Sequence, residues 1–145
     1  MKFLEAFIKE SLRNWAISVV VRTCTKDYFI PELNITIPKG SVIQVPGFGI
    51  MHQEKFYKNP NKFDPEGHFD SEILIPSTFF SFSQGPRNCI GMRFAMLIMK
   101  SLLVTVLANY KVLPGPGMKN TFEIYPLSPH ALPKGGVHIK LEKRQ

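Results

Sequence analysis

The sequence predicts a single domain of mixed α and β structure, and three observations lead to that prediction. Hydrophobic residues make up 44% of the 145 residues and charged residues 20%, a balance typical of a folded chain with a buried core. Residues 3–13 and 92–109 repeat apolar side chains at helical spacing. Between and after them, short alternating or β-branched stretches are separated by turns that contain proline and glycine.

Two helices are expected to frame the domain. Residues 3–13 combine an apolar row, which includes Phe3 and Phe7, with polar side chains such as Lys9, so this helix is amphipathic. Residues 92–109 are apolar nearly all round, and a helix of that kind is expected to be buried.

The first half of the chain also predicts strands. Residues 17–21 form a β-branched run that favours a strand. Residues 28–37 alternate apolar and polar side chains, and a turn at 38–40 leads into a short strand at 41–46. We therefore expect residues 28–37 and 41–46 to pair as an antiparallel hairpin.

The second half predicts a long loop and another hairpin. Residues 52–78 are rich in turn formers, and a loop of this length inside a domain is usually functional. Residues 122–127 and 137–141 alternate like strands, with a turn at 133–136 between them.

Charge and cysteine content narrow the classes of function. The formal net charge is +7, but the basic residues are scattered and no DNA- or RNA-reading motif accompanies them, so no nucleic-acid partner is expected. The two cysteines, Cys24 and Cys89, are too few for a disulfide framework, although one bridge between them stays open. Neither a signal peptide nor a run of about 18 apolar residues is found, so no membrane anchor is expected within this chain.

The stretch F-S-Q-G-P-R-N-C-I-G, residues 82–91, places Cys89 in a glycine-punctuated loop directly ahead of the second helix. Free N–H groups and the dipole at a helix N-terminus favour an anion, here the Cys89 thiolate. Gly85 and Gly91 let the backbone pass close to something large and flat. Arg87 offers a fork suited to a carboxylate, and the neighbouring Phe82 could cover the sulfur. These groups fit a planar metal cofactor with acidic arms, namely heme; the alternative is a buried structural cysteine.

The same stretch resembles the heme-binding motif of the cytochrome P-450 family, F-x-x-G-x-R-x-C-x-G, with every fixed position present. A second motif agrees, because Glu10-Ser11-Leu12-Arg13 is similar to the E-x-x-R of the family's K helix. The resemblance covers essentially the whole chain and is nearest to animal microsomal members, especially arthropod ones.

The resemblance implies a role for each matching residue. Cys89 would be the axial thiolate ligand, and the metal ligand, of heme b (iron protoporphyrin). Phe82 would lie over the thiolate, and Arg87 and Arg22 would bind the heme propionates. The implied cofactor-binding residues are Cys89, Arg87, Phe82, Gly85, Gly91 and Arg22. No catalytic residue beyond the iron ligand is expected in this chain.

A structural network is implied as well. Glu10 and Arg13 would form an ion-pair network with the long loop, where His68 stands nearest to the family's usual arginine. The chain departs from the family here, because the paired prolines after the K helix are missing and the loop is one residue longer.

By the same resemblance, residues 1–145 form the C-terminal, heme-ligating part of the mainly-α cytochrome P-450 fold. That part comprises the K helix, β-hairpin, meander loop, cysteine-ligand loop, L helix and terminal β-hairpin. The oxygen-activating helix and the membrane anchor would lie upstream, outside this chain. The implied activity is that of a heme-thiolate monooxygenase, which inserts one oxygen atom from O2 into an organic substrate. The alternative is a truncated, catalytically inactive fragment that binds heme weakly or not at all.

Partners and location are implied too. Apolar residues at 17–21 and 128–132 suggest a lipophilic small-molecule substrate. An electron-donating reductase would bind a basic proximal face. The basic side chains of that face are Lys58, Lys62, Arg93 and Lys100. The family's location is the cytoplasmic face of the endoplasmic reticulum membrane, reached only through the missing N-terminal part.

Overall fold

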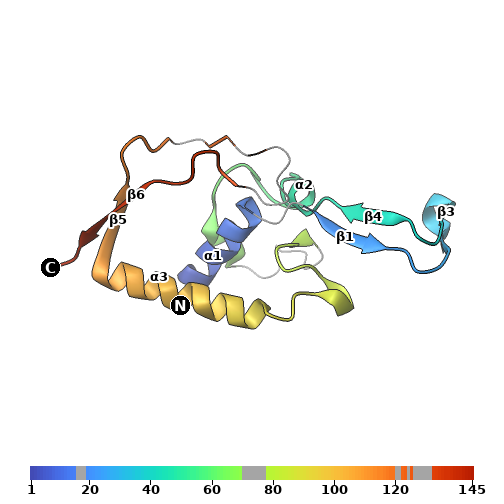
Figure 1. Cartoon of the computed structure of the whole chain (residues 1–145), viewed down its shortest axis with the longest axis horizontal. Helices are drawn as coiled ribbons and strands as arrows, with labels where there is room; N and C mark the ends of the chain where they lie inside the picture. Colours follow the sequence, from blue (N-terminus) through green and yellow to red (C-terminus); the bar gives the residue numbers. More distant parts are fainter. Residues whose placement is uncertain (16–18, 70–77, 120–121, 124, 126–131) are drawn as a thin grey trace.

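The computed structural model describes residues 1–15, 19–69, 78–119, 122–123, 125 and 132–145. Within these ranges, two longer helices lie side by side, and small two-stranded sheets extend from either end (Figure 1). The predicted class, mixed α and β, is confirmed. The fold positions the loop before the second long helix against the first long helix and a β-hairpin.

The first helix, α1 (Lys2–Asn14), confirms the amphipathic helix predicted at 3–13. It buries Ala6, Glu10 and Arg13 on one face and Ile8 on the opposite one. Its exposed Phe7 meets Phe63 of the long loop edge to face, with ring centroids 5.4 Å apart. An aromatic contact of this geometry adds to simple apolar burial, so the loop packs along α1.

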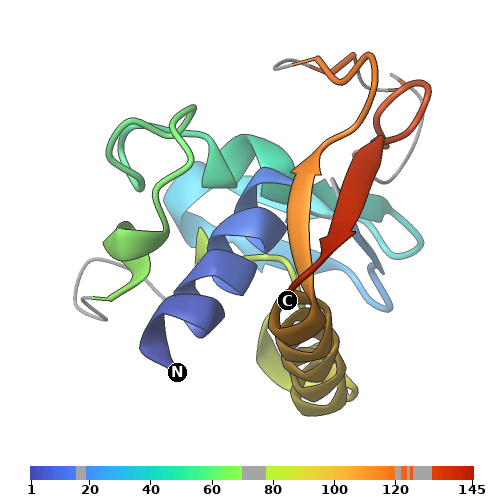
Figure 2. The same cartoon turned by 90° about the vertical axis from the view of Figure 1, so that its left-hand side faces the viewer.

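The second long helix, α3 (Met92–Asn109), confirms the helix predicted at 92–109, but the prediction that it is buried was wrong. None of its residues is buried, and Phe94, Leu97 and Leu102 are 68%, 61% and 60% exposed. Among the described residues, α1 and the strand after α3 are the main elements against it (Figure 2), and its exposed side chains show that much of its apolar surface is uncovered.

By length and composition alone, α3 is also apolar enough to cross a membrane, contrary to our expectation that no stretch qualifies. The core helix of a soluble protein meets the same criterion. Lys100 on α3 forms an ion pair with Glu5 on α1, with Nζ and Oε2 2.8 Å apart. Hydrogen bonds from Lys100 and Lys9 lower the pKa of Glu5 to about 2, so this pair joins the two helices across the pH range of most assays.

The strand prediction for 28–37 had the wrong partner. The segment folds on itself: β2 (Tyr28–Ile30) pairs antiparallel with β3 (Ile35–Ile37) across a 3-10 turn, η1 (Pro31–Leu33). Proline fixes φ for the start of that turn, and Asn34 closes it with φ 52°, a conformation that asparagine tolerates.

The true partner of the predicted strand at 41–46 is the β-branched run. β1 (Val20–Thr23) pairs antiparallel with β4 (Val42–Val45), with Arg22 opposite Ile43. The predicted strand at 17–21 therefore begins later than expected, and residues 16–18 lie outside the described part. Both small sheets form an arm that projects from the helices (Figure 1).

The C-terminal pairing was also wrong in part. β6 (Ile139–Lys143) pairs antiparallel with β5 (Tyr110–Pro114), which directly follows α3. Residues 123 and 125 instead bond to the segment at 132–134, through Lys134 N to Glu123 O at 2.7 Å and Tyr125 N to Leu132 O at 3.1 Å. Of the predicted strand at 122–127, residues 124 and 126–127 are not described.

A small apolar core forms around Met51, whose carbonyl accepts a hydrogen bond from Arg13 of α1. Met51, at the end of α2 (Gly47–Met51), is fully buried, and Tyr57 is 8% exposed. Three half-buried aromatic residues pack against this pair: Phe56, Phe79 and Phe80. Phe79 and Phe80 come just before residues 82–91, the loop that carries Cys89 and is called the cysteine loop below. The core therefore fixes the position at which this loop begins.

Gly115 continues the pairing of β5 and β6 beyond Pro114 and Ile139. Gly115 donates its N–H to the His138 carbonyl at 2.9 Å, and a Cβ added there would lie 2.7 Å from the His138 carbonyl carbon and oxygen. We predict that Gly115→Ala lowers the free energy of unfolding by about 1–3 kcal/mol, because backbone atoms must move apart. Urea unfolding followed by circular dichroism measures this change.

Gly67→Ala serves as the matched control. A Cβ at Gly67 meets nothing within 4 Å and its φ is not positive, so alanine should leave stability unchanged or raise it by up to about 1 kcal/mol. Equal stability of the two variants would contradict the predicted clash.

Candidate functional site

The loop around Cys89 is built from tight turns. Ser83 and Gly85 both have positive φ, 59° and 75°, and a short 3-10 turn, η4 (Gly85–Arg87), follows. The Cys89 N–H donates to the Phe82 carbonyl at 2.8 Å, which closes the loop back on its start. These turns present Cys89 three residues before α3 begins.

Both cysteines are free, so they form no bridge with each other. Cys89 is exposed and Cys24 is half-buried. The Cys89 carbonyl accepts the Met92 N–H at 3.3 Å, and the Gly91 carbonyl accepts the Ala95 N–H at 2.8 Å. Cys89 therefore stands at the N-terminus of an 18-residue helix, as predicted, and the alternative of a buried structural cysteine is contradicted.

An open groove of about 400 Å³ brings together four of the predicted cofactor-binding residues. Cys89, Arg87 and Phe82 line it from the loop, and Arg22 lines it from β1. The other lining residues are Val19, Val20, Val21, Phe80, Ser81 and Ser83. The groove thus joins a thiol, two guanidinium groups and an apolar wall.

The two predicted glycines shape the loop without lining the groove. A Cβ added at Gly91 would lie 3.9 Å from the Cys89 sulfur, in ordinary van der Waals contact. At Gly85 such an atom would meet nothing within 4 Å, but its φ of 75° disfavours any side chain. Gly91 keeps the space beside the sulfur open, and Gly85 permits the turn.

The two arginines differ in how they are held. Arg22 donates to the Val21 carbonyl at 2.8 Å through Nη1, and to the Ser83 hydroxyl at 3.0 Å through Nη2. The same Nη2 lies 3.4 Å from the Arg87 carbonyl. Arg87 lines the groove and is exposed. Ser83 is the contact that the sequence reading missed.

A buried ion-pair network lies between α1 and the long loop. Glu10 and Arg13 are each 2% exposed, and two hydrogen bonds of 2.8 Å join the Arg13 guanidinium to both carboxylate oxygens. Arg13 also donates to the Met51 carbonyl at 2.8 Å. The pair therefore links α1 to the end of α2.

His68 reaches the same carboxylate from η2 (Pro65–His68). Its Nε2 lies 2.7 Å from Glu10 Oε2, and its side chain is 3% exposed. The Asp64 N–H and the Asn14 amide also donate to Glu10 Oε1, at 3.0 and 3.1 Å. Sequence reading missed these two donors, although Asn14 stands four residues after Glu10, the spacing at which helical side chains meet.

Electrostatics keep Glu10 ionised. Burial alone would raise the pKa of Glu10, but hydrogen bonds from Arg13, His68 and the Asp64 amide outweigh it and hold that pKa well below its usual value. The network is thus a buried carboxylate fully surrounded by donors.

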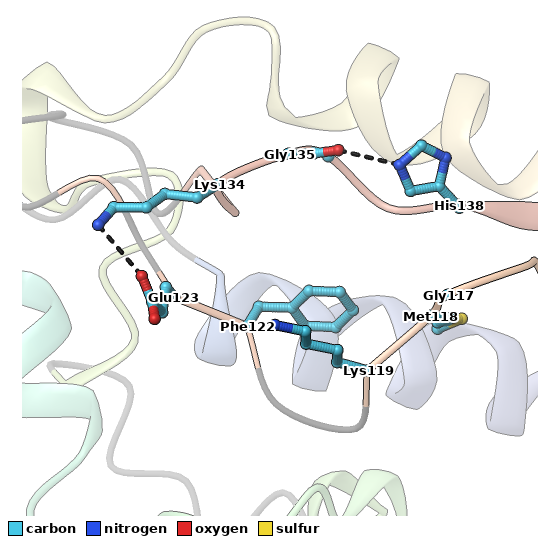
Figure 3. A pocket seen from close by; sticks show the side chains of 9 residues that line it. Gly117, Met118, Lys119, Phe122, Glu123, Lys134, Gly135 and His138 are labelled. Atoms are coloured by element: carbon cyan, nitrogen blue, oxygen red, sulfur yellow. Dashed lines mark hydrogen bonds and ion pairs between the residues drawn. The ribbon is translucent and has the colours of Figure 1, made fainter.

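Another hollow, of about 490 Å³, lies between residues 117–119 and 122–123 on one side and residues 134–136 and 138 on the other (Figure 3). Within it, Lys134 forms an ion pair with Glu123 at 3.2 Å, and His138 Nε2 lies 3.1 Å from the Gly135 carbonyl. None of the predicted site residues lines it.

Heme fits the donor set of the groove at Cys89. A cysteine sulfur is an established axial ligand of heme iron, and guanidinium forks suit the two carboxylate arms. The valines at 19–21 supply an apolar wall for the ring. A thiol, arginines and an apolar wall in one groove are the groups that a heme-thiolate protein uses.

Comparison with known proteins gives the family. A family model described as cytochrome P-450 matches residues 1–135. Cytochrome P-450 6B1 of Papilio polyxenes is 38% identical, over 99% of this chain and 30% of that protein. Probable cytochrome P-450 9f2 of Drosophila melanogaster is 37% identical, over 99% and 29%. Cytochrome P-450 3A5 of Homo sapiens is 38% identical, over 79% and 23%.

The chain belongs to the cytochrome P-450 family, as the resemblance implied. This family implies a mainly-α fold, a heme cofactor with a cysteine thiolate ligand, and monooxygenase activity. The chain spans about 30% of the length of the first two relatives.

The network generates a prediction about stability. Glu10→Gln removes the charge and leaves the buried Arg13 without its counter-ion, so we expect the free energy of unfolding at neutral pH to fall by about 3–5 kcal/mol. The folded pKa of Glu10 lies below its ordinary value of 4.5. Its contribution is therefore complete above pH 4.5 and is lost as the pH falls toward the folded pKa.

Urea unfolding of both proteins from neutral to acid pH measures both effects, and the variant should lack Glu10's share of the acid dependence. Glu66→Gln removes an exposed carboxylate from η2 and should change stability by about 0.5 kcal/mol or less. A Glu10→Gln variant as stable as this control would contradict the network's role.

Proposed function

We propose that this chain is the heme-ligating part of a heme-thiolate monooxygenase, with Cys89 as the axial ligand of heme b. The observation that carries the proposal is the groove in which Cys89, Arg87 and Arg22 meet. Heme bound through a thiolate supplies the activation of O2, since electron density from the sulfur favours O–O cleavage. The chain's own residues hold, orient and shield this group.

Cys89 is suited to ligation by its position. Its residue is exposed and lines the groove, and its loop ends at the N-terminus of α3. Phe82 lines the same groove half-buried, and we assign it the task of keeping water from the sulfur. Gly91 leaves room beside the sulfur for a flat ring.

Arg87 and Arg22 are proposed to bind the two propionates. They approach the groove from different elements, the cysteine loop and β1, so a carboxylate at each would fix the ring's rotation. Glu10, Arg13 and His68 remain structural in this proposal, because they are buried in their own network and do not line the groove.

We also propose which element of the family fold each segment of this chain forms. Residues 1–145 form one C-terminal portion of the domain, with α1 as the K helix, α3 as the L helix and residues 52–78 as the meander loop. The arm and the C-terminal strands supply the β-hairpins. The oxygen-activating helix and the membrane anchor would be upstream parts of the parent protein.

The parent protein's partners follow from the same proposal. Its substrate would be a lipophilic small molecule, since Val19–Val21 present an apolar wall; residues 128–131 lie outside the described part. A reductase would approach the basic face. Lys58, Lys62 and Arg93 are exposed there, Lys62 lies 3.9 Å from Asp64, and Lys100 forms an ion pair with Glu5. No nucleic-acid partner is proposed, and the location is the cytoplasmic face of the endoplasmic reticulum membrane.

Ligation by Cys89 is tested by absorption spectroscopy. The full chain is supplied with hemin, reduced and exposed to CO, and we expect the red-shifted Soret band of a thiolate-bound heme. Cys89→Ser should abolish that band, whereas Cys24→Ser should retain it because Cys24 does not line the groove. The absence of heme uptake, or a band unchanged in Cys89→Ser, would contradict the proposal.

The role of Arg87 is tested with a modified cofactor. Arg87→Gln should weaken hemin binding about tenfold, as expected for loss of one charge-assisted contact. Binding of the heme dimethyl ester, which has no free carboxylates, should change less than about twofold. Fluorescence quenching titrations of both cofactors give the two ratios, and an equal loss with both would rule out propionate binding.

A second candidate is a catalytically inactive product that binds heme weakly or not at all. The exposed apolar surface of α3 favours this candidate. Among the described residues the apolar core is too small to cover that helix. Oxygen-dependent oxidation of a lipophilic probe by the hemin-loaded chain separates the candidates: turnover supports the enzyme, and a thiolate band without turnover supports the inactive product.

A further inference from the structure

Ser83 adopts a backbone conformation that its residue type does not favour. Among the described residues, the non-glycine residues with positive φ are Asn34, Asn59 and Ser83. Asparagine visits this left-handed region readily, but serine does so at a cost in free energy. A serine held at φ 59° requires a compensating interaction from its surroundings.

The Ser83 N–H donates to the Phe80 carbonyl at 2.9 Å within the turn, and a side-chain interaction comes from β1. The Ser83 hydroxyl accepts a hydrogen bond from Arg22 Nη2 at 3.0 Å, across 61 positions of sequence. Nη2 also lies 3.4 Å from the Arg87 carbonyl, and Nη1 donates to the Val21 carbonyl at 2.8 Å. One guanidinium thus joins a strand to both ends of the turn at 83–87.

The conformation at Ser83 determines where the two key side chains of the loop stand. Its neighbour Phe82 receives the Cys89 N–H, and η4, which ends at Arg87, begins two residues later. A change of φ at Ser83 would therefore move the carbonyl that holds Cys89 and rotate the turn that carries Arg87.

We propose that Ser83 is a positioning residue: its hydroxyl and the Arg22 guanidinium form a clamp that holds the cysteine loop in its binding shape before the cofactor arrives. The purpose of this Arg22–Ser83 clamp rests on the proposed heme function. The clamp itself is a property of the chain without cofactor, so it can be tested separately.

Four variants and one control isolate the clamp. Ser83→Ala removes the acceptor and keeps the strained backbone, while all charges remain. Arg22→Gln removes the donor, and the double variant closes a mutant cycle. Ser83→Asn tolerates positive φ and restores an oxygen acceptor, so it is the rescue variant. Lys26→Gln removes a positive charge near β1 that touches neither residue and serves as the control.

The first measurement is amide hydrogen exchange of residues 82–89 in the full chain without cofactor. Ser83→Ala and Arg22→Gln should each speed this exchange about fivefold, the effect of one exposed charge-assisted hydrogen bond. The double variant should match the faster single variant, Ser83→Asn should approach the original rate, and Lys26→Gln should leave it unchanged.

The second measurement is the absorption of the reduced, CO-bound, hemin-loaded protein. Ser83→Ala should convert part of the thiolate-type Soret band to a band without thiolate ligation, and Ser83→Asn should recover it. A residue that only stabilises the fold would lower the amount of holoprotein without changing this ratio.

The outcomes separate the clamp from the proposed function. Unchanged exchange in Ser83→Ala, or effects of the two single variants that simply add, overturns the clamp. A normal thiolate band in the parent chain with unchanged exchange in the variants overturns the clamp and leaves heme ligation standing. The predicted exchange pattern without any heme uptake retains the clamp and overturns the heme function.

Discussion

The Glu10 carboxylate lies 2% exposed between α1 and the long loop, where five N–H donors from both sides meet its two oxygens. Removing a carboxylate from water costs several kcal/mol, and only a complete set of donors offsets that cost. Helix and loop must therefore be in place together. Because Arg13 also binds the Met51 carbonyl, the same charge pair fixes the end of α2 and the small core behind it.

The cysteine loop depends on this network through a short chain of contacts. Met51 packs with Phe79 and Phe80, and the next residue, Ser81, donates its hydroxyl to the Leu12 carbonyl on α1 at 3.0 Å. The loop thus begins at a point already fixed by α1 and the core. Its far end is fixed by α3, so the tight turns between these anchors set the position of the thiol.

Local sequence chemistry predicted much of this arrangement. The helical spacing of 3–13 and 92–109 was sufficient for α1 and α3, and the motif at 82–91 named residues that the structure brings to one groove. Strand partners could not be predicted, because alternation marks a strand but not its neighbour. At Pro31–Leu33 a turn outweighed the alternation, and β6 paired with β5 rather than with the segment nearer in sequence.

Contacts between distant side chains were beyond the sequence as well. Neither the hydrogen bond from the Asp64 N–H to Glu10 nor the one from Arg22 to the Ser83 hydroxyl has a local sequence signal, since each joins residues more than 50 positions apart.

The exposure of α3 could not be predicted for a different reason. Its apolar composition indicates that the helix is more stable when it is buried. Whether it is buried depends on which other elements pack against it.

If Cys89 binds the iron of heme through its sulfur, X-ray absorption fine structure at the iron edge detects that bond. In the hemin-loaded chain we expect one sulfur scatterer in the iron coordination shell, replaced by a nitrogen or oxygen scatterer in Cys89→Ser and retained in Cys24→Ser. A coordination shell of nitrogen and oxygen alone in the parent chain would contradict this ligation.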